Sequence, residues 1–297
     1  MIHASERFFK ELSKATEGKN FESEEEFQEF TDKFMQEYNA NINKERAYDA
    51  FDYLEMAENA SSSSAAIRYA QKALELDPNC LEADLIIAEA KSRSFKEFQK
   101  KLEKLIEKGE KQLSEQGISK EKDAGIFYGM HKTRPYMRVR REYFSVLREQ
   151  GKISLAISEA EELIRLNTND NMGIRYTLMA LYAYFEDEKR AETLYNDYAD
   201  DSAFMLLPLI ALYYKKGKDK KMKSNIRKLK KKNPNVLEAL SLLLDVEAED
   251  KLEEIKYSSG YRPFSEEEVV LAVIDMSFLY RQIPEFIEVL HDEVAKK

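Results

Sequence analysis

The stretch "AYDAFDYLEMAENASSSSAAIRYAQKALELDPN", residues 47–79, decides the fold. Two segments rich in alanine and leucine flank a run of serines, and the stretch closes on Pro78, as in a helix–turn–helix repeat of about 34 residues. Counting back from this proline places small residues on the second helix, where neighbouring helices must approach closely. The small residues are Ala66, Ala70 and Ala73, and the packing face of the first helix holds Tyr53, Leu54 and Ala57. The stretch therefore predicts a pair of packed helices.

The same helix–turn–helix pattern recurs further along the chain. Residues 136–170 and 203–235 repeat the order of apolar, small and turn residues, although Thr168 stands where a proline is expected. Weaker units occupy residues 80–117, whose second helix is expected to be long, and residues 171–199. Repeated helix pairs of this length are typical of tetratricopeptide (TPR) repeats. We predict an all-α protein, built as a right-handed α-α superhelix, a TPR-like solenoid.

The two ends of the chain differ from the repeats. Residues 1–44 carry aromatic residues at helical spacing between acidic runs, and we expect them to form N-terminal capping helices. The TPR-like repeats are expected over 45–246, and C-terminal capping helices over 247–297. Ser265, with Glu268 three residues later, predicts a capping box at the start of one of these last helices. Such terminal helices cover the open apolar ends of a solenoid.

The composition narrows the class of protein. Of the 297 residues, 35% are charged, and the net charge is −9. Nucleic-acid binders usually carry a basic surface, so we do not expect nucleic acid as the general partner. The N-terminus lacks the apolar core of a signal peptide. The longest apolar run, residues 203–214, contains Pro208 and is too short to cross a bilayer. These features predict a cytoplasmic protein without a transmembrane segment.

A search for catalytic chemistry finds little. The single cysteine, Cys80, excludes an intrachain disulfide, and we expect it to begin a helix as a small buried residue. His3, His131 and His291 lie far apart and show no metal-ligand spacing. No glycine-rich phosphate loop or nucleophile motif occurs. We predict that the protein is not an enzyme and that it holds no cofactor and no metal.

The segment "KTRPYMRVRREY", residues 132–143, concentrates basic residues in an acidic chain. Arg138 and Arg141 lie three residues apart and share a helix face with Arg148. The repeat phase turns this face toward the concave groove of the solenoid. We therefore predict that Arg138, Arg141 and Arg148 receive acidic groups of a partner.

Two other residues of this segment are expected to have structural roles. Pro135 fits the first turn of a helix, where its missing N–H is not needed. Arg140 falls at a packing position, and an unpaired buried guanidinium is too costly to persist. We predict that Arg140 is bound inside the protein, by a carboxylate or by carbonyl groups.

The segment "NTNDNMGIRY", residues 167–176, begins the following unit. Asp170 or Asn171 can cap its first helix. One interpretation of the segment is a joint between two repeats. The other extends the partner-binding groove with Asn171 and Arg175, whose amide and guanidinium groups can hold a carboxylate.

The segment "KKGKDKKMKSNIRKLKKK", residues 215–232, holds eleven lysine and arginine residues. One interpretation is a solvated outer face, with cations near a helix C-terminus where the helix dipole favours them. The other is a patch that binds RNA or an anionic surface. No aromatic residue interleaves the lysines, which disfavours binding by base stacking.

The chain contains four strings in a characteristic order and spacing, namely "AGIFYGMHKTRPYMRVR" (124–140), "LIRLNTNDNMGIRY" (163–176), "YADDSAF" (198–204) and "GYRPFSEEEVV" (260–270). Through these strings it resembles, over roughly residues 45–290, bacterial TPR proteins similar to the animal protein called suppressor of tumorigenicity seven. The resemblance implies an all-helical repeat fold and no assigned reaction. The chain departs from the family pattern at Thr168, at Phe264, where a glycine is usual, and in having no tryptophan.

These observations predict a non-catalytic scaffold. Its concave groove would bind a partner protein or peptide that presents acidic or carboxylate groups. The alternative is a regulator that associates with RNA or an anionic surface through residues 215–232. Self-association is a further option, because solenoid ends and exposed grooves can dimerise.

Overall fold

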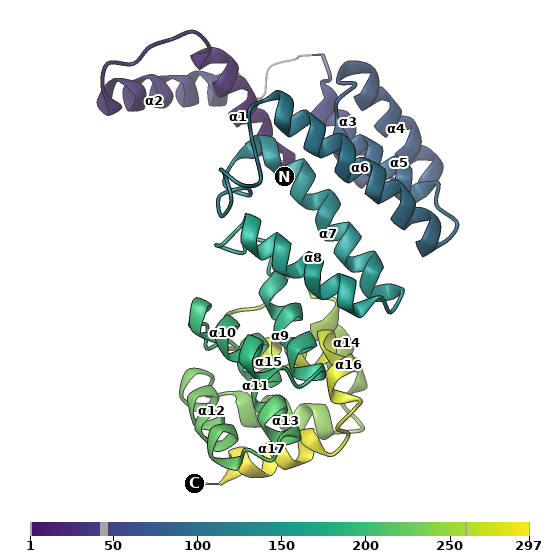
Figure 1. Ribbon diagram of the computed structural model, residues 1–297, viewed down its shortest axis with the longest axis vertical. Coiled ribbons are helices and arrows are strands. Elements are labelled where there is room, and N and C mark those ends of the chain that lie inside the picture. The colour runs from purple at the N-terminus through teal and green to yellow at the C-terminus, as the bar shows by residue number, and fades with distance from the viewer. Residues whose placement is uncertain (1, 42–46, 259, 297) are drawn as a thin grey trace. The chain divides into compact units, whose positions relative to one another are not determined.

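The computed structural model describes residues 2–41, 47–258 and 260–296. Within these ranges the regular structure consists of seventeen α-helices and one short 3₁₀-helix, with no β-strand beyond an isolated bridge between Ile126 and Asn167 (Figure 1). The prediction of an all-α protein is confirmed. The chain forms two compact units, unit 1 (Met1–Asn171) and unit 2 (Met172–Lys297). The predicted boundary between residues 44 and 45 lies outside the described residues, and the division into caps and repeats stays a prediction.

In unit 1 the helices from α3 to α8 form a succession in which each packs on the next, and α1 contacts both α2 and α3. In chain order the elements are α1 (Ile2–Thr16), α2 (Glu24–Asn41), α3 (Ala50–Glu58), α4 (Ser63–Leu76), α5 (Leu81–Ala90), α6 (Phe95–Glu115), the 3₁₀-helix η1 (His131–Thr133), α7 (Arg134–Glu149) and α8 (Ile153–Leu166). The pairs α3–α4, α5–α6 and α7–α8 correspond to the three helix pairs predicted in this part of the sequence. The first helices of successive pairs also meet, because α3 contacts α5 and α5 contacts α7.

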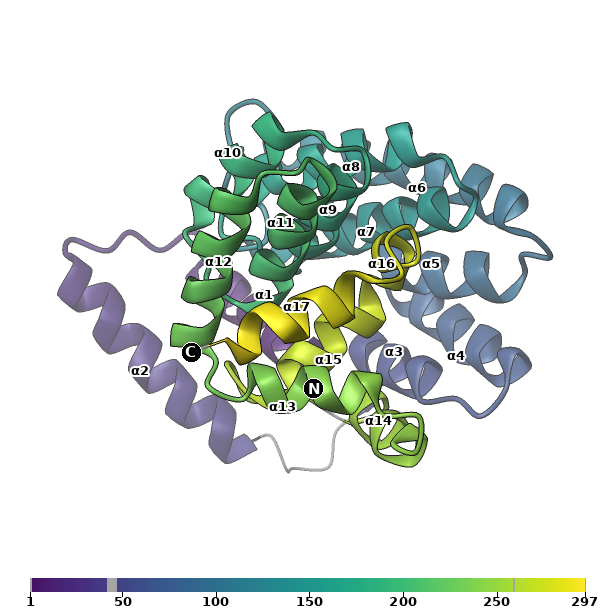
Figure 2. The same ribbon diagram turned by 90° about the horizontal axis from the view of Figure 1, so that it is seen from below.

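Unit 2 is built around one fully buried helix. In chain order its elements are α9 (Ile174–Tyr184), α10 (Glu188–Tyr198), α11 (Ala203–Lys215), α12 (Asp219–Lys232), α13 (Val236–Leu244), α14 (Glu249–Lys256), α15 (Glu266–Asp275), α16 (Ser277–Tyr280) and α17 (Phe286–Ala295). Every residue of α11 from Ala203 to Tyr213 is buried. Helices α9, α12 and α15 pack against it, and Figure 2 shows these helices from a second direction.

The small residues expected on the second helix of the first pair lie in the core. Ala70 and Ala73 on α4 are completely buried, and Leu54 on α3 is 1% exposed. With no side chain beyond Cβ, these alanines let α4 pack closely on both α3 and α5. The equivalent alanines of α8, Ala156 and Ala160, are also completely buried. The packing pattern predicted from the sequence is confirmed at these positions.

Left-handed residues end several of the helices. Gly151 follows α7 with φ 68°, and Gly217 follows α11 with φ 61°, as expected for glycines at helix C-termini. Phe264 has φ 60°, a conformation that costs a non-glycine residue about 1–2 kcal/mol.

Two side-chain caps were predicted, at Ser265 and at Asp170 or Asn171, and the helix caps in the structure match the first but not the second. Ser265 caps α15 by accepting a hydrogen bond from the Glu268 backbone N–H, which is one half of the predicted capping box. The Glu268 carboxylate accepts from the backbone N–H of Phe264 at 2.6 Å and from that of Ala203 at 2.6 Å, so it also ties α15 to the start of α11. The prediction that Asp170 or Asn171 caps the next helix is wrong, since α9 begins after a left-handed Gly173.

A backbone joint explains the threonine that replaces the expected proline after α8. The Thr168 N–H donates to the carbonyl of Gly125 at 3.0 Å, and the Phe127 N–H donates to the carbonyl of Leu166 at 2.9 Å. Proline has no N–H and would lose the first of these bonds. The joint fixes the segment that leads into α7, and therefore the position of the arginines on that helix.

Candidate partner-binding surface

Arg138, the first of the predicted groove residues, is directed into unit 1 and not toward an open groove. Its Nη2 donates to both carboxylate oxygens of Glu6, at 2.7 and 2.8 Å, and forms a second ion pair with Glu82. Glu6 belongs to α1 and Glu82 to α5, so one guanidinium joins three helices. The Arg138 side chain is 15% exposed. The expectation that Arg138 faces the groove is therefore corrected, because internal carboxylates already take its charge.

The Arg138 contact is incomplete on the arginine side. Both carboxylates share one nitrogen, while Nε and Nη1 are buried without a hydrogen-bond partner among the described residues. Burial lowers the pKa of Arg138, but the carboxylates of Glu82 and Glu6 outweigh this effect and raise it. The guanidinium stays charged, and two of its three nitrogens are left without a partner among the described residues.

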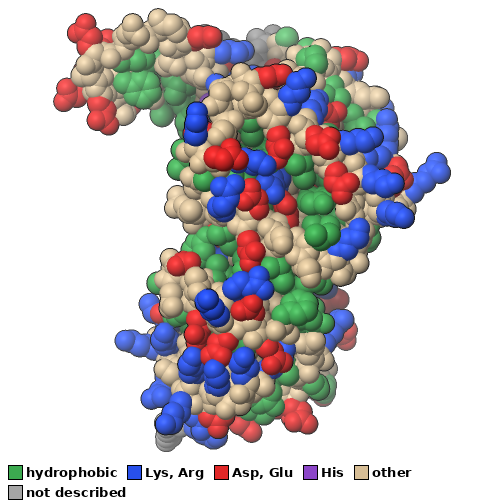
Figure 3. All heavy atoms as spheres, in the orientation of Figure 1, with side chains coloured by type: hydrophobic (Ala, Val, Ile, Leu, Met, Phe, Trp, Pro, Cys, Tyr) green, Lys and Arg blue, Asp and Glu red, His purple; other side chains and the backbone are tan. Residues whose placement is uncertain are grey.

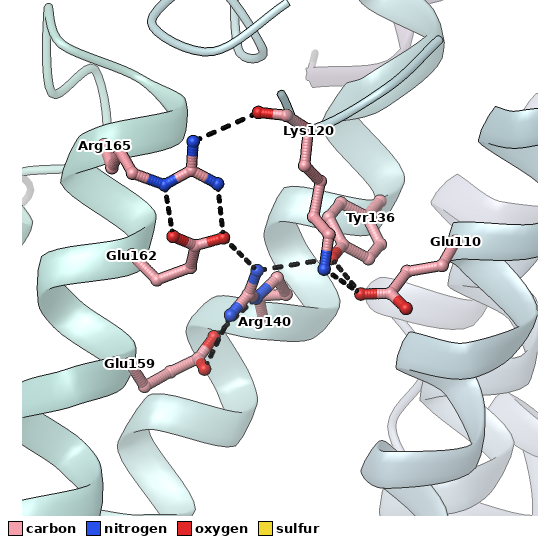
Figure 4. Close-up of polar contacts among 7 residues, drawn as sticks. All are labelled: Glu110, Lys120, Tyr136, Arg140, Glu159, Glu162 and Arg165. Atoms are coloured by element: carbon pink, nitrogen blue, oxygen red, sulfur yellow. Dashed lines mark hydrogen bonds and ion pairs between the residues drawn. The ribbon is translucent and has the colours of Figure 1, made fainter. Parts of the chain in front are cut away.

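Arg140, two residues along α7, is buried and paired, as predicted. Its Nε and Nη2 donate to the two carboxylate oxygens of Glu159 on α8, at 2.6 and 2.8 Å (Figure 4). The remaining nitrogen, Nη1, donates to the Tyr136 hydroxyl at 3.2 Å and to Glu162 at 3.4 Å. Every terminal nitrogen of this guanidinium has a partner, which is the arrangement a buried charge requires.

The Arg140 contacts extend into a network of seven residues that joins α6, α7, α8 and the loop after α6 (Figure 4). Its members are Glu110, Lys120, Tyr136, Arg140, Glu159, Glu162 and Arg165. Three cations face three carboxylates, so the network is balanced in formal charge. Burial raises the pKa of Glu110, but the hydrogen bonds from Lys120 and Tyr136 more than reverse this effect and leave that pKa lowered. A balanced and internally bonded network serves to hold the helices together and leaves no charge for a ligand.

Arg141 and Arg148 lie nearer the surface of α7. The Arg141 side chain is 48% exposed, and its Nη2 pairs with the neighbouring Glu142 at 3.2 Å. The Arg148 guanidinium lies over the Phe144 ring, 5.6 Å from its centre. Neither arginine belongs to the seven-residue network drawn in Figure 4. They stay candidates for contact with a partner.

Arg175 belongs to unit 2, where it forms a joint between α9 and the segment after α10. Its Nε and Nη2 donate to Oδ2 of Asp200 at 3.1 and 2.9 Å. The guanidinium also lies over the rings of Tyr176 and Tyr198, at 4.2 and 5.1 Å from their centres. These contacts match the interpretation of the segment as a structural joint. Asn171 is exposed at the end of unit 1.

Most cations of the lysine-rich segment 215–232 have contacts within unit 2. Lys218 and Lys221 both pair with Glu188, and Lys221 also pairs with Glu192 at 2.6 Å. Lys215 donates to the carbonyls of Ala183 and Tyr184 at the end of α9. On the face that Figure 3 displays, basic and acidic side chains are interspersed. These pairs favour the interpretation of the segment as an outer face that neutralises its own charges.

The largest hollow described in unit 1 lies beside α1 and encloses about 710 Å³. Helices α1, α3, α5, α6 and α7 contribute to its walls. The apolar part of the lining consists of Leu54, Cys80, Leu81, Leu113, Pro135 and Tyr136, and the charged part includes Lys10, Lys14, Glu17, Asp77, Glu115 and Lys132. The buried pair of Glu6 and Glu82 also lines the hollow, so the Arg138 contact forms one of its ends. A hollow of this size with an apolar base and a charged rim is suited to the side chains of a bound segment.

Two potentially reactive residues face this hollow, and neither is activated. Burial raises the pKa of the Cys80 thiol to about 12, so the thiolate is scarce at neutral pH. As predicted, Cys80 immediately precedes a helix, α5. Burial lowers the pKa of His131, whose ring stacks on Phe9 at 6.0 Å between centres. The raised pKa of the Cys80 thiol disfavours nucleophilic chemistry in the hollow. The residues that line the hollow are instead placed to contact a bound segment.

The sequence reasoning missed this hollow and the role of α1. The helix has alternating acidic and basic residues, Glu6, Arg7 and Lys10, which is a visible signal for a helix that binds through charges. Their partners lie 132, 42 and 67 positions away, with Lys10 donating to Asp77 at 2.9 Å. Such long-range pairs cannot be read from the spacing of residues along one chain.

The described residues contain no group of three or more histidine, cysteine or acidic side chains placed to hold a metal ion. In residues 2–41, 47–258 and 260–296, every helix is too short or too polar to cross a bilayer. No protein-family model matches the sequence, and neither does any curated protein.

Proposed function

We propose that the protein is a non-catalytic, TPR-type scaffold that binds a segment of a partner protein beside α1 in unit 1. Within unit 1, the helix pairs and the contacts between their first helices, α3 with α5 and α5 with α7, support a stack of TPR-like helix pairs. The resemblance to bacterial TPR proteins similar to suppressor of tumorigenicity seven belongs to the same proposal. The raised pKa of the buried Cys80 thiol disfavours nucleophilic chemistry at that residue.

The observation that carries this proposal is the hollow of about 710 Å³, with its apolar base and charged rim. Grooves between helices commonly bind an amphipathic segment, whose apolar side chains fill the base while its polar side chains meet the rim. Lys14 and Lys132 on the rim can receive acidic groups of the partner. Glu17 and Glu115, on the same rim, favour a partner that also carries cations.

Site-specific photo-crosslinking tests the proposal. A photoreactive residue at Gln116, which lines the hollow and is exposed, is compared with one at Ser158, an exposed residue of α8 that does not line it. In a native lysate, we expect a defined protein adduct at Gln116 and none at Ser158. The additional substitution Gln112→Trp places a ring in the hollow and is expected to abolish the adduct, with the helical circular dichroism unchanged. Equal labelling at both positions, or an adduct that Gln112→Trp leaves intact, contradicts the proposal.

A further inference from the structure

Helix α1 is attached to the rest of unit 1 mainly through charged side chains. The ion pairs are Glu6 with Arg138, Arg7 with Asp49 and Asp52, and Lys10 with Asp77. Lys10 and Arg7 also lie over the Phe51 ring, at 5.3 and 5.8 Å from its centre. Contacts of this kind are sensitive to salt, because ions screen charges near the surface.

Few apolar side chains support this attachment. Among the α1 residues whose side chains are described, Leu12 is the one buried apolar residue. On α7, by contrast, Met137, Val139 and Leu147 are all nearly or completely buried. Segments with few buried apolar contacts open locally at a lower free energy than the core. Helix α1 therefore has the contacts of a segment that can leave its site.

The fit of α1 to the surface beside it is also poor. Lys10 and Ser13 of α1, and Glu17 just after its end, line the hollow together with Leu54 and Leu81. The two leucines are 1% and 3% exposed, so the polar side chains border about 710 Å³ that protein does not fill, above an apolar base that is nearly covered. At the end of the hollow, Arg138 uses one nitrogen for both carboxylates and leaves two donors without a partner. Both features indicate a surface that another helix would fill better.

We infer that the surface covered by α1 is a docking site for an amphipathic helix of a partner protein, and that α1 occupies this site in the free protein. This inference rests on the proposed function and adds the kind of partner and the step that precedes its binding. The partner helix carries a carboxylate that pairs with Arg138. One residue after this carboxylate it carries a cation for Asp49 and Asp52, and four residues after the carboxylate it carries a second cation for Asp77. At the positions equivalent to Ser13 and Glu17, it carries large apolar residues.

The spacing of these positions follows from helix geometry. Glu6, Lys10 and Ser13 are four and three residues apart, which places them on one face of α1, and Glu17, four residues further and just after the end of α1, would continue that face in a longer helix. All four line the hollow. A single helical partner can therefore satisfy the charged end and the apolar base together.

The first experiment measures binding of a fluorescent peptide with the sequence of residues 2–20 to the full-length chain by anisotropy. In the wild-type chain α1 competes with the peptide, so only the fraction with α1 detached binds it. The chain with Glu6→Ala and Lys10→Ala weakens that competition, and we expect it to bind the peptide about tenfold or more tightly than the wild type. The matched control, Glu29→Ala with Lys33→Ala on α2, removes one acid and one base outside the site and is expected to leave the affinity unchanged.

The second experiment changes the peptide. A version with Ser13→Leu and Glu17→Leu presents two apolar side chains to the base of the hollow. Because burying each leucine is favourable, we expect it to bind the Glu6→Ala, Lys10→Ala chain about tenfold or more tightly than the native peptide does. Equal or weaker binding overturns the inference that the apolar base is the recognition surface.

A charge exchange shows where the peptide binds. A peptide with Lys10→Glu is expected to lose affinity for the Glu6→Ala, Lys10→Ala chain and to regain it when that chain also carries Asp77→Lys. Such rescue requires the two residues to meet, and a chain that had only unfolded cannot give it. If no peptide binds the weakened chain, or if the exchange gives no rescue, α1 does not occupy a docking site. A specific Gln116 adduct in that case still supports the proposed function, with the partner bound while α1 stays in place.

Discussion

Arg138 and Arg140 lie two residues apart on α7, yet they differ in how many of their guanidinium nitrogens have hydrogen-bond partners. Arg140 uses all three guanidinium nitrogens, two of them in a bidentate pair with Glu159 from the adjacent helix of the same pair. Arg138 uses one nitrogen for two carboxylates, and one of these comes from α1, 132 positions away in the sequence. The first contact is built into a helix pair and the second holds a terminal helix on the surface. Similar chemistry thus serves permanent packing on one face of α7 and a weaker attachment on the other.

Breaking the Arg140 contact is expected to have the largest effect on stability. Arg140→Ala leaves Glu159 buried without its partner, and removing one member of a buried pair costs about 3–5 kcal/mol. We expect this loss in the free energy of unfolding measured with urea. The double variant Arg140→Met with Glu159→Met removes both charges and should recover most of it. If Arg140→Ala costs less than about 1 kcal/mol, the network is not the permanent joint described above.

A close approach of α6 to α7 gives the next effect. A Cβ added at Gly109 would lie 2.7 Å from Cδ2 of Tyr136 and 3.1 Å from Cδ2 of Leu81. Gly109→Ala gains about 1 kcal/mol in helix propensity, but overpacking typically costs about 1–3 kcal/mol. Because Tyr136 is itself held by the Arg140 network, we expect net destabilisation in urea unfolding. Ser114→Ala, at an exposed position of α6, is the control and should not destabilise. A more stable Gly109→Ala chain would contradict this packing.

The substitution Glu6→Gln tests the Arg138 contact, which is the weaker attachment of the two compared above. The substitution removes one of two carboxylates from Arg138, which keeps Glu82 as its partner, so no buried charge is left alone. We expect a change below about 1 kcal/mol in global unfolding, together with faster hydrogen exchange confined to α1. Glu159→Gln is the matched substitution in the network and should cost clearly more. Equal losses for the two variants would show that both arginines serve the core.

Whether a feature of the fold or of the site could be predicted from the sequence depends on how far apart its interacting residues lie along the chain. The helix pairs and the burial of Ala70 and Ala73 depend on local periodicity, and the sequence was sufficient for them. The role of Arg140 followed from its packing position, because its partner lies in the next helix. Arg138 could not be placed, since Glu6 approaches it only after the whole of unit 1 has folded. The capping residue of α9 was missed because a left-handed Gly173 replaces the expected side-chain cap.

The smallest expected effect concerns a surface cluster in unit 2. Hydrogen bonds from Lys218 and then Lys221 lower the pKa of Glu188 to about 2. A carboxylate with a lowered folded pKa contributes stability above its ordinary value of 4.5, and this contribution is lost as the pH falls toward 2. Because the pairs are at the surface, we expect only a small stability change for Glu188→Gln at pH 7. An NMR titration should show the pKa of Glu188 returning toward 4.5 in a Lys218→Met, Lys221→Met chain. No change in that pKa would contradict the assignment of these contacts.

Native-state hydrogen exchange of α1 and α7 in the same sample tests the central claim most directly. If α1 is a detachable helix held by ion pairs, its amides should exchange far faster than those of α7, and added salt should widen the difference. Protection of α1 equal to that of α7 and insensitive to salt would mean that α1 belongs to the core. That result would contradict the distinction drawn between Arg138 and Arg140.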